Sequence, residues 1–226
     1  MNPDRRHGMS LRSRLGLLMA ILSVGCSGPE FVPDITLPQA RPIIDATAEF
    51  HDLYPAPALL SGKESFGLDS PKAKHVEPSD LTDRVEAELM AALNDAGVFT
   101  RITRFDPEPD LILTGRINSL QERLRPQIWS KLPYLGTVAQ VLDVKSHISS
   151  GEADLTLFVL KPNGELIGKY TGRSTFKETF NPTKDVPPGA RLNHALSEAV
   201  EQIQKKLVED AHLRTVAASL SQSRKD

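Results

Sequence analysis

The sequence predicts an α+β domain with a mostly antiparallel sheet and two helices packed on one face, in the order β-α-β-β-(insert)-β-β-α. Two segments with apolar residues at helical spacing, and one Asn-Gly dipeptide between strand-like segments, support this prediction. Each helical segment carries a single apolar stripe, as expected of a helix that covers one face of a sheet. We expect the domain to span residues 46–213 of the 226-residue chain.

The N-terminal half of the domain contains the clearest helix. Residues 46–54 fit a first strand, and residues 55–78, rich in Gly, Ser, Pro and Lys, are expected to form a loop. Ser79 is the expected N-cap of a helix that ends at Gly97. Its apolar stripe recurs every four residues: Leu81, Val85, Leu89 and Leu93. Charged residues outside the apolar patterns of this helix and of the later strands are expected in solvent: Glu86, Glu88, Arg116, Glu122 and Arg123.

The C-terminal half consists of short strands, a long insert and a closing helix. Strand patterns follow at 98–105, 110–124, 153–160 and 165–179. Asn163-Gly164, between the last two, indicates a tight hairpin because both residue types tolerate positive φ. The closing helix begins near Gly189 and has an apolar stripe formed by Leu192, Leu196, Val200, Ile203 and Leu207. Residues 214–226 are expected to be a frayed tail.

Residues 1–25 are typical of an export signal. Two arginines precede the apolar stretch 15–25, which ends directly at Cys26, the only cysteine. Eleven helical residues span about 16 Å, roughly half of a hydrocarbon core, so this stretch is too short for a transmembrane anchor. Either Met1 or Met9 is the start, because the signal is complete without the first eight residues.

Residues 23–26, Ser-Val-Gly-Cys, resemble the lipobox of bacterial lipoproteins. The resemblance implies cleavage before Cys26 and acyl chains on its thiol, which together hold the protein on a membrane. The family prefers Leu at the position of Ser23, and here Leu22 lies one place earlier. Ser27 stands where lipoproteins of the inner membrane usually carry Asp, which implies sorting to the outer membrane, facing the periplasm. A conventional secretory signal remains the alternative.

Residues 26–45 are expected to form a proline-rich tether between the lipid and the domain. Its prolines recur every four to five residues without a helical or alternating period: Pro29, Pro33, Pro38 and Pro42. Such spacing favours an extended polyproline-type chain of about 3 Å per residue, which gives twenty residues a reach of up to about 60 Å. Alternatively, part of the segment lies along the domain surface.

Charge and motif spacing exclude several classes of function. Residues 1–25 hold four of the 27 basic and one of the 29 acidic residues, which leaves 23 and 28, or a net charge of −5. A mildly acidic domain is not expected to bind nucleic acid. No histidine lies three to five residues from another, so we expect no metal. Residues 164–170 lack the spacing of a phosphate-binding loop and residues 62–67 that of a nucleophile elbow, so we expect no cofactor and no enzymatic activity. His51-Asp52 is expected to be an exposed pair, and His194 a residue at the edge of the apolar stripe.

The long insert between residues 125 and 150 holds the only tryptophan. An insert of this length inside a compact domain is often functional. Four of its residues are candidate contacts with a partner protein or a membrane interface: Trp129, Leu132, Tyr134 and Leu135. The alternative is that Trp129 belongs to the core and that Val138, Val141 and Leu142 form a short helix over the sheet edge.

A helix ending in Ala96-Gly97-Val98 precedes a strand at 110–117, a hairpin at Asn163-Gly164 and a closing helix at 192–200. This pattern is similar to small outer-membrane lipoproteins of cell-envelope assembly. Their domains resemble the N-terminal domain of the Tol-Pal β-propeller protein, penicillin-binding-protein activators and the curli secretion lipoprotein. The resemblance implies a membrane-anchored binding or accessory module with an envelope protein as partner. An auxiliary lipoprotein of an ABC-type lipid or solute transporter is the alternative, and the oligomeric state stays open.

Overall fold

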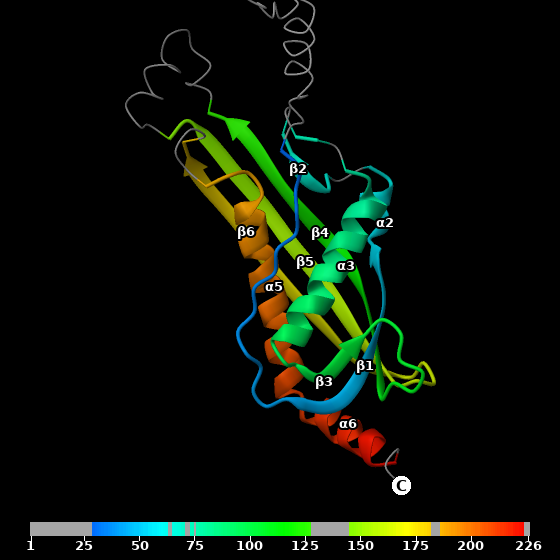
Figure 1. The fold of residues 1–226 in the computed structure, drawn as a ribbon. Coiled ribbons are helices and arrows are strands. Elements are labelled where there is room, and N and C mark those ends of the chain that lie inside the picture. Colours follow the sequence, from blue (N-terminus) through cyan, green and yellow to red (C-terminus); the bar gives the residue numbers. More distant parts are fainter. Residues whose placement is uncertain are drawn as a thin grey trace, which may run out of the picture.

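The structure is a computed structural model that describes residues 29–62, 65–70, 73–74, 76–127, 145–181 and 186–223. The predicted α+β class is confirmed, since a six-stranded sheet carries helices against it (Figure 1). The elements, in chain order, are β1 (Ile44–Pro55), α2 (Pro57–Leu60), β2 (Gly67–Asp69), α3 (Pro78–Asp95), β3 (Phe99–Thr103), β4 (Leu111–Pro126), β5 (His147–Leu160), β6 (Leu166–Phe180), α5 (Ala190–Glu209) and α6 (Ala211–Ser223).

The sheet is mixed, where a mostly antiparallel sheet was predicted. Its strand order is β3-β1-β4-β5-β6, and β2 also pairs with β4. The pairs β4–β5 and β5–β6 are antiparallel, whereas β1 runs parallel to β3 and to β4, and β2 runs parallel to β4. The chain returns from β1 through α3, and a helical crossover of this kind brings the next strand in parallel.

The two predicted amphipathic helices are confirmed, and both cover the same face of the sheet (Figure 1). Every leucine, valine and isoleucine of their predicted stripes is buried. Helix α3 starts earlier than expected: its N-cap is Glu77 in place of Ser79, and Pro78 takes the first helical position. Proline suits that position because its fixed φ matches the helix and its missing N–H has no partner there.

Three local predictions meet different outcomes. The hairpin at Asn163-Gly164 is confirmed, with Gly164 at φ 85° and a hydrogen bond from Lys161 N to Glu165 O. The expected loop at 55–78 contains the short elements α2 and β2. The expected frayed tail is wrong for residues 214–223, because they belong to α6, which turns Leu213 and Ala217 into the core.

The expected tether is also corrected, because residues 29–43, hereafter the strap, pack onto the domain. In Figure 1 the strap starts between α3 and α5, crosses in front of α5 and then turns into β1. Its odd-numbered residues Phe31, Pro33 and Ile35 are buried and the even-numbered residues between them are exposed. This period of two is that of an extended chain lying on a surface.

Polar side chains of both helices fix the strap. On the α5 side, Asn193 and Ser197 accept the backbone N–H groups of Asp34 and Thr36, each at 3.1 Å. On the α3 side, Glu88 accepts the N–H of Ile35 at 3.2 Å. Side chains of the helices therefore bind backbone N–H groups of the strap, as a neighbouring strand would in a sheet. Of the two predicted alternatives, the structure has the one in which the segment lies along the domain surface.

Two glutamates expected in solvent are buried, each beside a strand irregularity. Glu86 accepts the N–H of Leu53 at 2.8 Å, where the pairing of β1 with β4 shifts register, and also pairs with Arg104. Glu122 is 0% exposed, because a register shift of β4 between residues 117 and 119 turns the following even-numbered residues toward the helices. Arg116 is exposed as expected, while Glu88 and Arg123 are half-buried.

Candidate functional site

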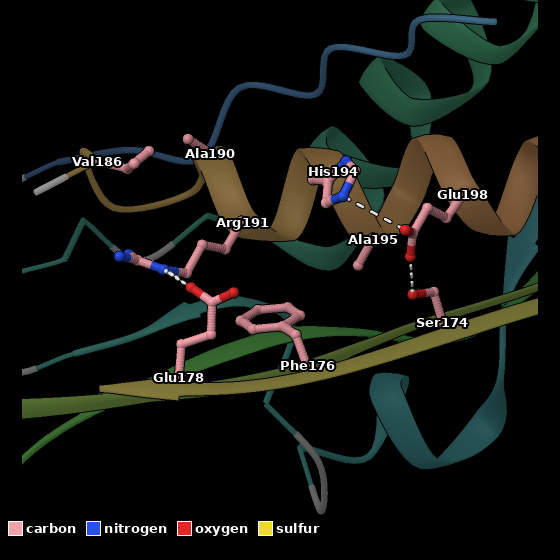
Figure 2. Close-up of a pocket in the computed structure, with 9 residues that line it drawn as sticks. All are labelled: Ser174, Phe176, Glu178, Val186, Ala190, Arg191, His194, Ala195 and Glu198. Atoms are coloured by element: carbon pink, nitrogen blue, oxygen red, sulfur yellow. Dashed lines mark hydrogen bonds and ion pairs between the residues drawn. The ribbon is translucent and has the colours of Figure 1, made fainter. Parts of the chain in front are cut away.

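A groove of about 250 Å³ lies between the last strand, β6, and the first half of α5 (Figure 2). Its lining residues come from β6, from the chain before α5 and from α5 itself: Ser174, Phe176, Glu178, Val186, Ala190, Arg191, His194, Ala195 and Glu198. We refer to this feature as the groove.

Simple periodicities place these side chains opposite one another. On β6 the residues Ser174, Phe176 and Glu178 alternate with residues of the other face and point toward α5 (Figure 2). On α5 the lining residues Arg191, Ala195 and Glu198 recur after four and three positions, on one side of the helix. The floor is apolar and the rim is charged.

The close contact between α5 and β6 beside the groove depends on a glycine, Gly172 of β6. A Cβ on Gly172 would lie 1.8 Å from the backbone oxygen of Ala199, so no other residue fits without moving the helix. At its start, α5 is held by a buried carboxylate: Glu122 accepts the N–H of Gly189 at 2.8 Å and the hydroxyl of Ser149 at 2.6 Å. A negative charge at a helix N-terminus is favourable because it faces unpaired N–H groups.

The rim at the start of α5 is formed by one arginine. Arg191 donates from Nε to Glu178 at 2.9 Å, and its guanidinium lies 4.6 Å from the centroid of the Phe180 ring. Its side chain is 11% exposed, and its buried Nη1 has no hydrogen-bond partner among the described residues.

The opposite rim brings a serine, a glutamate and a histidine together, in the wrong order for nucleophilic catalysis. Glu198 accepts the hydroxyl of Ser174 at 2.6 Å and lies 3.3 Å from Nε2 of His194. In a catalytic triad the imidazole stands between hydroxyl and carboxylate and removes the proton of the nucleophile. Here the carboxylate is in the middle, so Ser174 is not activated by His194. The arrangement suits binding.

The outer edge of β6 differs along its length. Gln202 of α5 accepts the N–H of Arg173 at 3.2 Å and donates to its carbonyl at 2.9 Å, and Lys206 donates to the carbonyl of Thr171. The backbone groups of these odd-numbered residues therefore face away from β5. By the alternation of the antiparallel ladder, Thr175 and Lys177 turn theirs outward too. No strand pairs with this outer edge in the part of the chain that the structure describes.

The site residues predicted from the sequence meet separate outcomes. Cys26, Trp129, Leu132, Tyr134 and Leu135 lie outside the described residues, so their roles stay predictions. His51 and Asp52 lie on β1 and are exposed, as expected, and His194 is exposed at the rim of the groove. The sequence did not predict the groove. Its two walls are separate segments of the chain, and only their packing makes one site.

Among the residues that the structure describes, no helix is long and apolar enough to span a bilayer. In the same residues, no group of three or more His, Cys, Asp or Glu side chains is placed to hold a metal ion.

No protein-family model matches the sequence, and no curated protein does. Several solved structures are similar to this chain at low sequence identity. A Xanthomonas campestris protein of the family model DUF330 is 14% identical, with a TM-score of 0.47 over 84% of this chain and 99% of that one. The PelC dodecamer of Paraburkholderia phytofirmans is 12% identical, with a TM-score of 0.30 over 76% and 92% of the two chains.

A protein named as a candidate lipoprotein, from Caulobacter crescentus, is 16% identical, with a TM-score of 0.32 over 60% of this chain and 84% of that chain. The structural neighbours therefore include a lipoprotein by name. At these identities and scores, the similarities do not assign the chain to a family.

Proposed function

We propose that the chain is a lipid-anchored accessory protein of the bacterial cell envelope, without enzymatic activity, that faces the periplasm from the outer membrane and binds another envelope protein. The observation that carries this proposal is the position of Cys26. The cysteine ends an export-type apolar stretch, and the strap that follows it packs onto the domain from residue 29 onward. Lipid attached there would join a rigid domain to a bilayer.

The open part of β6, residues 175–180, together with the groove, is where we place the partner contact. A strand edge with outward N–H and C=O groups can accept an extended peptide as a further strand, and a neighbouring pocket then selects its side chains. Phe176 and Val186 offer the groove an apolar surface. Lys177, exposed on this edge, favours a partner segment with an acidic residue opposite it.

The anchor is tested by metabolic labelling with a fatty-acid analogue and by membrane fractionation. The wild-type chain is expected to carry the label and to sediment with outer membranes, whereas Cys26→Ser is expected to lose both properties. A mature wild-type protein without acyl chains would contradict the anchor. An acylated protein found in the inner-membrane fraction would be consistent with the lipid anchor and would contradict location in the outer membrane.

The partner contact is tested with a photoreactive residue at Lys177, on the open part of β6, and at Lys205, an exposed position of α5 that serves as control. Crosslinking in cells followed by mass spectrometry is expected to give a discrete envelope-protein adduct from position 177 and none from position 205. A second photoreactive residue at Thr175 is expected to give the same adduct, and the additional substitution Lys177→Pro should remove it. The fold should stay intact, because the N–H that proline lacks points away from β5. Lys177→Ala should retain it, and equal loss in both variants would exclude strand addition.

The apolar floor of the groove favours one second candidate, an auxiliary lipoprotein of a lipid or solute transporter. In that case the groove would receive an apolar part of the transported molecule. Native mass spectrometry of protein extracted from membranes distinguishes the two functions. A lipid or solute bound in stoichiometric amount, and lost in Phe176→Ser, would favour the transporter role over strand addition.

A further inference from the structure

We propose that the end of the domain at which the strap begins rests on lipid headgroups, so that the sheet stands upright on the bilayer. This inference rests on the proposed lipid anchor at Cys26, and it names the surface that the anchored domain contacts. The occupant of this end is a lipid headgroup surface that contains anionic lipids.

The first argument is the short length of chain between the lipid and the fixed domain. The carbonyl of Pro29 accepts the N–H of Lys74 at 3.1 Å, and Glu30 forms ion pairs with Lys74 at 2.8 Å and with Arg84 at 2.6 Å. These pairs lower the pKa of Glu30, chiefly through the hydrogen bond from Lys74. Phe31 is 2% exposed. Three residues, from Cys26 to Pro29, span at most about 10 Å.

The second argument is where the strap begins. Phe31 lies against Gly67 of β2 and against Gly189, where an added Cβ would approach its ring to 3.2 Å. β2 pairs with residues 121–123 of β4, close to the end of that strand at Pro126. Figure 1 shows the start of the strap and the ends of β4 and β6 at one end of the molecule, and the β5–β6 hairpin at the other.

The length of the sheet separates the two ends widely. β4 has 16 residues, and a strand of that length extends for about 50 Å. A connection of about 10 Å therefore keeps one end of the domain at the headgroups. The long axis of the sheet can then stand perpendicular to the bilayer, with the hairpin far from it, or lie parallel to the bilayer. Contacts at the near end decide between these two orientations.

The third argument is the chemistry of that end. Two basic side chains are exposed where β4 ends and where β5 begins: Arg125 and Lys145. Two acids of the same region are paired, Asp69 with Arg123 at 3.6 Å and Glu178 with Arg191 at 2.9 Å. Exposed basic residues beside apolar ones suit a bilayer surface that carries anionic headgroups.

An exposed valine completes the surface. Val32 of the strap is 64% exposed. Asn193 of α5 donates to the carbonyl of Val32, so this valine lies beside the first turn of α5. Small apolar side chains in such a position enter the headgroup region without requiring a deep insertion.

The orientation is measured with fluorescent labels. The only cysteine carries the lipid in the acylated protein, so a single introduced cysteine reacts selectively. Acylated Val186→Cys and Asn163→Cys are labelled and reconstituted in vesicles of phosphatidylethanolamine and phosphatidylglycerol that contain a lipid-borne nitroxide quencher. We expect quenching at position 186 to be several-fold stronger than at position 163, which lies in the distant hairpin. Equal quenching at both positions would overturn the proposal.

Charge and connection length are then varied separately. The double variant Arg125→Glu, Lys145→Glu should reduce quenching at position 186 in vesicles that contain phosphatidylglycerol, and the control Lys161→Glu, Lys169→Glu at the other end should not. A flexible insertion of fifteen Gly and Ser residues between Gly28 and Pro29 should also reduce it. Quenching unchanged by both the charge reversal and the insertion would contradict docking on headgroups.

Failure of the anchor is distinguished from failure of this inference by one prior measurement. The intact mass of the protein extracted from membranes reports whether acyl chains are present. A protein without them contradicts the proposed function. An acylated, vesicle-bound protein with equal quenching at the two positions contradicts only the orientation.

Discussion

The strap and the open part of β6 are both extended, and the way they satisfy their backbone groups is opposite. The strap belongs to no sheet, yet side chains of α3 and α5 accept three of its N–H groups, those of residues 34–36. Its residues Phe31, Pro33 and Ile35 are buried. The open part of β6 belongs to a regular sheet, yet no strand pairs with its outer edge among the described residues. Membership in a regular sheet therefore does not show whether the backbone groups of a segment have partners. The hydrogen bonds of the backbone show it directly.

The largest effect is expected from the strap itself. Phe31→Ala should lower the free energy of unfolding by about 3–5 kcal/mol, because it empties a buried site. Val32→Ala, at an exposed neighbour, should change it by about 0.5 kcal/mol or less. Urea denaturation of the soluble domain measures both. Similar small changes in the two variants would mean that the strap is a tether after all.

Residues 171–173 of β6, whose outer edge is covered by side chains of α5, are expected to lose this cover when the close contact with α5 is lost. Gly172→Ala places a methyl group against the backbone oxygen of Ala199 and should cost about 3 kcal/mol. The matched control is Thr175→Ala, at an exposed position of the open part, where little change is expected. Thermal unfolding followed by circular dichroism is the measurement, and equal midpoints for the two variants would refute the contact.

The buried carboxylate under the start of α5 should have an intermediate effect. Glu122→Ala leaves the N–H of Gly189 and the hydroxyl of Ser149 without their acceptor, and should cost about 2 kcal/mol. Glu122→Gln keeps an acceptor oxygen and should recover part of the loss. Chemical denaturation compares the variants with the wild type. A Gln variant as unstable as the Ala variant would show that charge, rather than hydrogen bonding, holds the helix start.

A smaller effect separates the two parts of β6 directly. Gln202→Ala should cost about 1 kcal/mol and expose the N–H of Arg173, so that its amide hydrogen exchanges faster with solvent. Glu201→Ala, next along the helix and exposed, serves as control. Hydrogen exchange followed by mass spectrometry resolves the segment. Unchanged exchange at residue 173 would mean that Gln202 does not protect the edge.

The smallest change in the free energy of unfolding at neutral pH is expected from Tyr170→Phe, at the junction between α5 and α6. Burial, followed by the hydrogen bond to Asp210, raises the pKa of Tyr170 above its ordinary value of about 10. The folded state thus retains a proton that the unfolded state loses, and this contribution to stability is complete below about pH 10 and declines as the pH rises further. Tyr170→Phe should remove that decline from urea unfolding curves.

Tyr54→Phe, at an exposed tyrosine, is the control for this pH dependence and should keep the wild-type slope. The same slope in Tyr170→Phe and in the wild type would assign the decline to other groups. At low pH the sign is opposite for Asp210. Burial opposes its ionisation, but hydrogen bonds from Tyr170, Leu213 and His212 outweigh burial and lower its pKa, so its contribution is lost as the pH falls through that pKa.

Local patterns in the sequence predicted the elements whose partners are close along the chain. The stripes of α3 and α5 and the hairpin at Asn163-Gly164 follow from periodicity and turn chemistry alone. Glu86 and Glu122 were wrongly predicted to be in solvent. The burial of each depends on a register shift in a strand, and no residue type in the sequence indicates such a shift. The alternating burial of Phe31, Pro33 and Ile35 could not be seen in the sequence, because Val32 between the first two is also apolar.

The groove lay beyond sequence reasoning for a different reason. It exists only because β6 and α5, separated along the chain by residues 181–189, meet at Gly172. Parallel pairing of β1 with two neighbours was missed in the same way, since the sequence gives strands but not their order. The candidate contacts at Trp129 and Tyr134 remain predictions.

The direction of the strap has a mechanical consequence. A force applied at residue 29 along the long axis of the molecule would act along the strap, whose contacts with Asn193, Ser197 and Gln204 are spread over its length. Contacts loaded in this shear geometry bear the force together, whereas contacts loaded at one end would break one after another. A domain pulled by its membrane attachment would therefore resist peeling, and single-molecule extension from that terminus should need a higher force than extension started at the β5–β6 hairpin.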